Sequence, residues 1–181
     1  MADLSPTLMG LKLRNPVVIA SSGLTAELDG IRRCEDAGAG AVVLKSLFEE
    51  QIMADLDKAI QEATFLTHTE AEDYFVSMGR SHYMEQYFTL VQAAKKAVSI
   101  PVVASVNCIT AETWIEYAKG FQTAGADALE LNVFVLPSDP AVDSRKLEAH
   151  YLQIASRISA GVTLPVAMKI GSHFTGLAHP L

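Results

Sequence analysis

Polar side chains follow short apolar runs of this sequence, at the points where buried strands would end. Two lysines, Lys45 and Lys169, and two asparagines, Asn107 and Asn132, are the members best suited to chemistry. In parallel β/α folds the active site lies beyond the carboxyl ends of the strands, so we expect these side chains to meet at one rim. Ammonium and amide groups in that arrangement suit a polar, partly anionic planar ligand. The residues expected at the rim are Ser21, Ser22, Gly23, Lys45, Ser46, Asn107, Glu130, Asn132 and Lys169.

Each rim residue also has a purely structural interpretation. A strand-end lysine such as Lys45 is often only a solvated rim residue, and Asn132 could merely cap the following turn. Glu130 could lie outside the barrel, among the helices. Lys169 differs because apolar residues flank it on both sides, so its ammonium must snorkel out of the core or meet a partner at the barrel mouth. Lys169 therefore favours a functional rim.

Histidine and cysteine spacing gives no support for a metal site or a disulfide framework. None of the five histidines forms an HxxxH or His-Glu pattern, so no metal is expected. The only two cysteines, Cys34 and Cys108, are far apart and form no CxxC pair. We expect Cys108 to be a small buried hydrophobe and the single tryptophan, Trp114, to lie in the core.

Composition excludes several classes of function. The chain has 181 residues, 50% of them hydrophobic, which is enough for one core and one domain over 1–181. Its 14 basic and 21 acidic residues give a net charge of −7, without the basic cluster that nucleic acid or anionic membrane would need. No signal peptide or membrane-spanning stretch is recognisable. We therefore expect a cytoplasmic protein with no nucleic-acid or membrane partner.

Five apolar runs alternate with longer amphipathic stretches. The predicted strands are Val17–Ala20, Ala41–Leu44, Pro101–Val106, Ala128–Leu131 and Pro165–Ile170. The clearest helical patterns cover 84–98, 111–124 and 143–160. This alternation predicts parallel strands, because each crossover must carry the chain back to the same edge of the sheet. Glycine and proline should end the helices in turn, because neither continues a helix well.

The interval 48–82, after the second predicted strand, is longer and less periodic than the others. It contains a helix-like stretch over 52–63 and then a polar segment that leads to Ser77-Met78-Gly79. Long insertions at such positions are commonly substrate loops or lids. A surface excursion without function is the equal alternative.

The five strand-helix units predict the N-terminal portion of a TIM-type (β/α)8 barrel. A complete barrel needs about 250 residues and rarely fewer than about 200, so the barrel expected in this chain is incomplete. An open doubly wound sheet would suit the length better. The turn after its first strand, Ser21–Thr25, is however not the Gly-rich fingerprint of nucleotide-binding sheets.

Several motifs in this order resemble class 1 dihydroorotate dehydrogenases. They are Leu11-Lys12-Leu13-Arg14-Asn15-Pro16-Val17 to Ser21-Ser22-Gly23, Leu44-Lys45-Ser46, Ser77-Met78-Gly79, Glu130-Leu131-Asn132-Val133, and Pro165-Val166-Ala167-Met168-Lys169. The resemblance covers nearly the whole chain, but only the first half to two-thirds of the family's barrel. It implies an FMN-dependent oxidoreductase that oxidises a CH–CH bond of dihydroorotate, or a related small molecule, in pyrimidine biosynthesis.

The resemblance also implies roles for single residues. Ser21, Ser22 and Gly23 would lie along the flavin, with Ser46 and Asn107 as further cofactor contacts. Lys45 and Lys169 would hold the pyrimidine-like end of the ring, where a positive charge stabilises the anionic reduced form. Lys45 and Asn132 would take part in catalysis. The substrate contacts would be Lys45, Met78, Gly79 and Asn132.

Two departures from the family concern the substrate. The family places a Cys or Ser base three residues after the matching asparagine, where this chain has Val135, which cannot accept a proton. Only Ser138 or Asp139 could replace it from a displaced loop. The family also has an asparagine before Ser77-Met78-Gly79, where this chain has Val76.

Two alternatives to a flavin enzyme remain. Lys45 or Lys169 could form a Schiff base as in an aldolase-type barrel, if burial lowered its pKa. Because barrel phosphate sites follow the last two strands, we expect the chain alone to bind FMN poorly and to be inactive. The chain could also be a catalytically silent dihydroorotate dehydrogenase-like fragment. Exposed apolar strand edges would favour self-association, so a homo-oligomer is expected.

Overall fold

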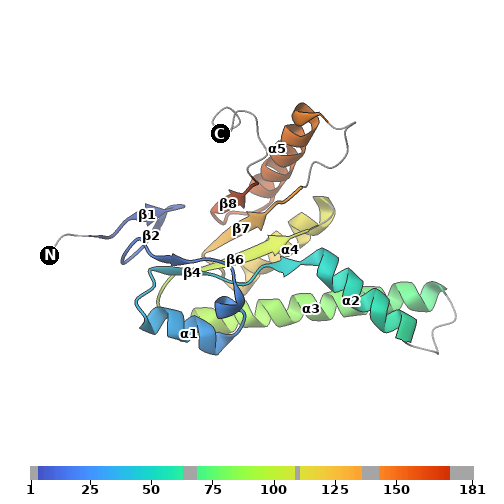
Figure 1. Cartoon of the computed structure of the whole chain (residues 1–181), viewed down its shortest axis with the longest axis horizontal. Coiled ribbons are helices and arrows are strands. Elements are labelled where there is room, and N and C mark those ends of the chain that lie inside the picture. Colours follow the sequence, from blue (N-terminus) through green and yellow to red (C-terminus); the bar gives the residue numbers. More distant parts are fainter. Residues whose placement is uncertain (1–3, 63–68, 109–110, 136–142, 172–181) are drawn as a thin grey trace.

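A curled parallel sheet with helices on its outer face forms the body of the molecule (Figure 1). The computed structural model describes residues 4–62, 69–108, 111–135 and 143–171. The sheet strands are β3 (Val18–Ile19), β4 (Ala41–Val43), β6 (Val102–Asn107), β7 (Ala128–Asn132) and β8 (Val166–Lys169), and β5 (Leu47–Phe48) also pairs with β6. All five predicted strands are therefore confirmed within a few residues.

Strand order decides between the two fold classes that the sequence allowed. Neighbours in the sheet follow the order β3-β4-β6-β7-β8, and all these pairs are parallel. A doubly wound sheet reverses its order at a switch point, whereas a barrel adds each strand beside the previous one. The fold is therefore an α/β half-barrel of the (β/α)8 type, and the barrel prediction is confirmed.

The helices cover the outer face of the sheet (Figure 1). They are α1 (Leu28–Asp36), α2 (Glu49–Glu62), α3 (Thr69–Ala97), α4 (Ala111–Ala124) and α5 (Ser144–Gly161). Apolar side chains of α1, α3, α4 and α5 and the outward residues of the strands form one cluster, which we call the outer core. Trp114 is 2% exposed in this cluster, as expected. Among the described residues, no helix combines the length and apolar character needed to cross a membrane.

Two glycines end helices as predicted. Gly38 follows α1 with φ of +97°, and Gly125 follows α4 with φ of +89°. This left-handed conformation lets the next amide turn back to the last helical turn. Ala39 N–H donates to the Cys34 carbonyl over 3.0 Å, and Ala126 N–H donates to the Phe121 carbonyl over 3.1 Å. Each turn leads directly into a buried strand.

The predicted polar segment that leads to Ser77-Met78-Gly79 is not an irregular loop over 69–79, because these residues lie inside α3. Its earlier residues lie outside the described part of the chain. The first part of α3 pairs with α2, and the two helices extend beyond the sheet (Figure 1). A side chain at Gly79 would collide with Leu56 of α2, so glycine permits the close helix contact. Later turns of α3 pack on α1 and α4 instead. Because the buried face of α3 changes along its length, no single periodicity marks it in the sequence.

An N-terminal hairpin, which the sequence patterns did not predict, covers one end of the sheet interior. It consists of β1 (Thr7–Leu8) and β2 (Leu11–Lys12), joined through Met9 and Gly10, both with positive φ. Met9 and Leu11 pack on the interior cluster formed by Val43, Val103 and Ala128. Val103 and Ala128 lie near the amino ends of β6 and β7, so the hairpin covers the end of the sheet interior opposite the predicted rim.

Candidate functional site

The inner face of the sheet can be assigned strand by strand. Along β6, Val102, Ala104 and Val106 belong to the outer core, whereas Val103 belongs to the interior cluster. Side chains alternate between the two faces of a strand, so Ser105 and Asn107 face the interior with Val103. The same alternation from the clustered residues of β4, β7 and β8 assigns Lys45, Glu130, Asn132 and Lys169 to the interior.

Strand register places the predicted residues of β7 and β8 beside each other. Asn132 pairs with Lys169, one rung beyond the pair of Leu131 and Met168. Neighbouring strands lie about 4.8 Å apart, so this amide and this ammonium leave adjacent positions at the carboxyl end of the sheet. Asn132 is 9% exposed, whereas Lys169 and Lys45 are both exposed. The sheet therefore gives both lysines the common interior face that a shared ligand site requires.

A chain of hydrogen-bonded side chains runs across the interior from β3 to β7, and we call it the serine chain. Ser21 Oγ lies 3.1 Å from Ser46 Oγ, and Ser46 Oγ lies 2.6 Å from Ser105 Oγ. Ser105 Oγ then donates to Glu130 Oε1 over 2.8 Å. Since Ser105 gives its hydrogen to Glu130, Ser46 must donate to Ser105. The chain therefore ends on the carboxylate as its acceptor.

This chain settles the position of three expected residues. Ser21 and Ser46 meet at the strand ends, as the sequence predicted, and Ser46 N–H also donates to Ser21 Oγ over 2.8 Å. Glu130 lies in the interior rather than among the helices. Sequence analysis missed Ser105, which is fully buried. Its signal was available, because Ser105 is the one hydroxyl within the apolar run Val102–Val106.

Ser22 and Gly23 lie in the turn after β3, where Ser22 has a local structural role. Ser22 Oγ accepts a hydrogen bond from Leu24 N–H over 3.3 Å and caps the short helix η1 (Gly23–Thr25). Thr25 Oγ1 accepts from Ser22 N–H in return. A Cβ atom at Gly23 would have no neighbour within 4 Å, so protein packing does not demand glycine there. Their place along a flavin remains a prediction.

Met78 and Gly79 are not brought to the strand ends by the fold. Met78 is exposed on α3, and Gly79 contacts α2. The part of α3 that carries them pairs with α2 beyond the sheet (Figure 1). A direct contact of these two residues with a ligand at the rim therefore gains no support from their position.

Cys108, next to Asn107, belongs to a buried polar cluster outside the interior. Burial raises the pKa of the Cys108 thiol, and the nearby Glu49 carboxylate raises it further, which keeps the thiol neutral. Glu49 is 4% exposed and accepts a hydrogen bond from Thr113 Oγ1 over 2.9 Å. Arg80 Nη1 lies 3.7 Å from Glu49 Oε1. The cluster joins α2, α3 and α4. Its role is structural, because it does not activate the Cys108 thiol as a nucleophile.

Val135, at the position of the expected base, packs against the outer core. Its backbone N–H donates to the Tyr151 hydroxyl of α5 over 3.3 Å. The Val135 side chain therefore faces the helix layer. Ser138 and Asp139, the possible substitutes, lie outside the described residues.

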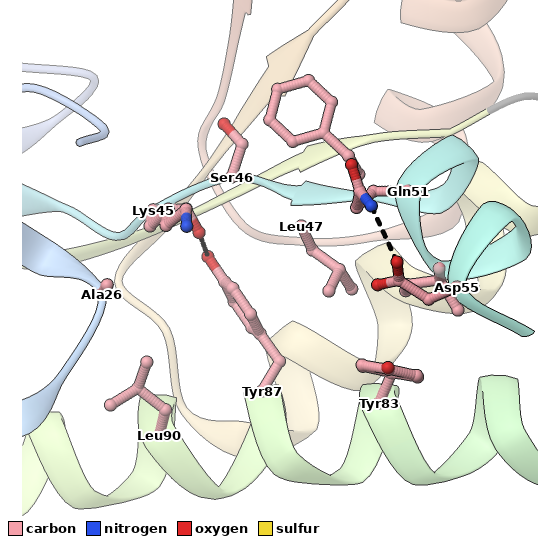
Figure 2. Close-up of a pocket in the computed structure, with 11 residues that line it drawn as sticks. Ala26, Lys45, Ser46, Leu47, Gln51, Asp55, Tyr83, Tyr87 and Leu90 are labelled. Carbon is pink, nitrogen blue, oxygen red and sulfur yellow. Dashed lines mark hydrogen bonds between the residues drawn. The ribbon is translucent and has the colours of Figure 1, made fainter. Parts of the chain in front are cut away.

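A pocket of about 250 Å³ lies between the β4–β5 strand line and helices α2 and α3 (Figure 2). Leu47, Ile52, Tyr83, Tyr87 and Leu90 provide most of its apolar wall. Figure 2 shows Tyr87 rising from α3 with its hydroxyl directed at the Lys45 carbonyl. Ser46 points away from α3 in the same view, whereas Leu47 points toward it. Lys45 and Ser46 also line the pocket, so the pocket and the serine chain meet at this strand.

Comparison with known proteins gives oxidoreductases as relatives at low identity. The catalytic subunit of dihydroorotate dehydrogenase B (NAD(+)) from Thermoplasma volcanium is 25% identical over 98% of this chain and 57% of its own length. A putative dihydroorotate dehydrogenase A (fumarate) from Aeropyrum pernix is 28% identical over 93% of this chain and 54% of its length. A subunit of NAD-dependent dihydropyrimidine dehydrogenase from Escherichia coli K12 is 27% identical over 93% and 42%.

The chain thus spans about half the length of the curated relatives it matches. No family model matches it. A solved structure of a prophage protein from E. coli K12, of the dihydrodipicolinic acid synthase family and in complex with pyruvate, covers 88% of this chain and 46% of its own. The TM-score is 0.50 and the identity 17%, so this likeness concerns the barrel fold alone.

Proposed function

We propose that this chain forms the cofactor-facing part of an FMN-dependent oxidoreductase of the dihydroorotate dehydrogenase type. The observation that carries this proposal is the common interior face of Lys45, Asn107, Asn132 and Lys169 at the carboxyl end of the sheet. The similarity to dihydroorotate and dihydropyrimidine dehydrogenases supports a substrate with a dihydropyrimidine ring. Active sites of such barrels lie at this end of the strands.

The donor set fits the ring of a flavin. The pyrimidine edge of the isoalloxazine presents two carbonyl oxygens and ring nitrogens, and ammonium and amide groups can donate to them. Lys45 and Lys169 are exposed on the interior side, while the amide of Asn132 is held at a buried position beside Lys169. Barrel phosphate loops follow strands seven and eight, so only the ring end is assigned to the described residues.

Bound FMN would supply the acceptor for a hydride from the substrate. Lys45 and Lys169 would place positive charge beside the carbonyl edge, which favours the reduced ring electrostatically. Asn132 would orient the ring or the substrate through its amide. Val135 excludes a base at the usual position, so we assign removal of the neighbouring substrate proton to Ser138 or Asp139.

A Schiff-base aldolase is the weaker candidate. A lysine nucleophile of that kind needs a lowered pKa, which a desolvated pocket or a neighbouring cation provides. Both candidate lysines are exposed, and neither is enclosed in a dry pocket of the described residues. The noncatalytic alternative is a dihydroorotate dehydrogenase-like chain that catalyses no reaction.

Titration of the purified protein with FMN, followed by flavin fluorescence, tests the proposal. We expect binding that weakens about tenfold when either Lys45 or Lys169 is replaced by alanine, since each charged contact is worth roughly 1.5–3 kcal/mol. Lys146→Ala, an exposed change on α5, is the matched control. FMN affinity that neither interior substitution alters would refute the proposed site.

A further inference from the structure

The strand that carries Lys45 contains one extra residue. The β4–β6 ladder has its last pair at Val43 and Val103, and pairing with β6 resumes at Leu47 and Val106. Three residues, 44–46, thus face two residues, 104–105, of the partner strand. Such a β-bulge re-aims side chains and commonly lies next to active sites.

The bulge turns two successive side chains to the interior. Leu44 and Leu47 both pack in the outer core, so the strand faces outward at each end of this segment. Between them, Ser46 faces the interior, where it meets Ser21 and Ser105. Lys45 follows the outward Leu44 and faces the interior by alternation. A regular strand would direct one of these two polar residues into the outer core.

Tyr87 of α3 fills the gap that the bulge leaves in the ladder (Figure 2). Its hydroxyl donates to the Lys45 carbonyl over 2.8 Å and accepts from Ser105 N–H over 3.3 Å. The Ser105 carbonyl also lies 3.2 Å away. Tyr87 is 9% exposed, and burial raises the pKa of its hydroxyl, so it stays a donor throughout the physiological range.

We propose that Tyr87 is a positioning residue, whose hydroxyl holds the bulge and thereby directs Lys45 toward the ligand site. This inference rests on the proposed flavin function. It adds a residue with no ligand contact of its own, on a helix of the outer layer. Tyr87 would therefore influence flavin binding only by positioning Lys45.

A double-mutant cycle of Tyr87→Phe and Lys45→Ala tests this dependence. Tyr87→Phe should weaken FMN binding about five- to tenfold and lower the flavin midpoint potential, because one hydrogen bond fixing Lys45 is lost. In the Lys45→Ala background the same change should alter the affinity less than about twofold. Tyr83→Phe, one turn earlier on α3 and lining the same pocket, is the matched control and should behave as the unmodified protein.

Two results of the binding measurements would overturn the inference. One is that Tyr87→Phe has the same FMN affinity and flavin midpoint potential as Tyr83→Phe. The other is an effect of Tyr87→Phe that persists in full without Lys45, which would mean a general structural role. Hydrogen exchange of the Ser105 amide gives a readout without flavin and should accelerate in Tyr87→Phe. If the unmodified protein binds no FMN, the proposed function fails, while unchanged Ser105 exchange would refute the role of Tyr87 separately.

Discussion

Ser105 donates a hydrogen bond to Glu130 across the interior of the sheet, over 2.8 Å between Oγ and Oε1. The two residues are also direct partners in the β6–β7 ladder. The neighbouring strand therefore donates a hydrogen bond to this half-buried carboxylate. This contact fixes the end of the serine chain.

Replacing Ser105 by alanine should destabilise the protein by about 1–3 kcal/mol, because Glu130 and Ser46 both lose a buried partner. The free energy of unfolding from urea titration measures the change. Ser77→Ala, at an exposed position of α3, should stay within about 0.5 kcal/mol of the unmodified protein. Equal stability of the two variants would contradict the serine chain as a buried network.

Replacing Arg80 should remove the cation that lies beside the buried Glu49 carboxylate. We expect Arg80→Ala to lower the free energy of unfolding by about 2–4 kcal/mol, near the range for a broken buried pair. The double variant Arg80→Ala with Glu49→Gln should recover part of this loss, because no uncompensated charge then remains. Arg32→Ala breaks an exposed pair with Asp29 and should change stability by less than about 0.5 kcal/mol.

Glu35 links stability to pH through the turn that precedes β6. Its pKa is lowered, chiefly by the Ser99 hydroxyl and then by the Ser99 and Ile100 amides and Arg14, against a smaller opposing effect of burial. A carboxylate with a lowered pKa stabilises the fold above its ordinary pKa of 4.5, and this stabilisation is lost as the pH falls through the lower folded value.

Glu35→Gln should therefore be less stable than the unmodified protein at pH 7, and the difference should shrink toward about pH 3. Urea midpoints at the two pH values measure it. A difference that grows on acidification would show that Glu35 has the opposite linkage.

Borohydride treatment with pyruvate should leave the mass of the protein unchanged. Schiff-base formation needs an activated lysine, and Lys45 and Lys169 are both exposed. Mass spectrometry of the intact protein measures adduct formation. A stoichiometric adduct that disappears in Lys169→Ala would move the assignment to the aldolase class.

The sequence predicted the sheet well because buried parallel strands are short, continuous apolar runs between glycine and proline terminators. It also predicted which face Lys169 and Asn132 would occupy, because strand-end position and alternation require no tertiary information. Register then made them neighbours. The parts of the site that depend on these local rules were therefore accessible.

The bulge and Tyr87 could not be predicted in the same way. An extra residue in a strand is visible only against its partner, and Tyr87 lies 42 positions from Lys45 in the sequence. The first turns of α3 were hidden because the helix buries different faces along its length. The β1–β2 hairpin was missed because two-residue strands carry too few side chains for an alternation pattern.

The β1–β2 hairpin affects how a ligand can reach the interior of the sheet. Met9 and Leu11 pack on Val43, Val103 and Ala128, so apolar contact covers this end of the half-barrel interior. A ligand that meets the serine chain at the carboxyl ends of the strands therefore has no path past this hairpin.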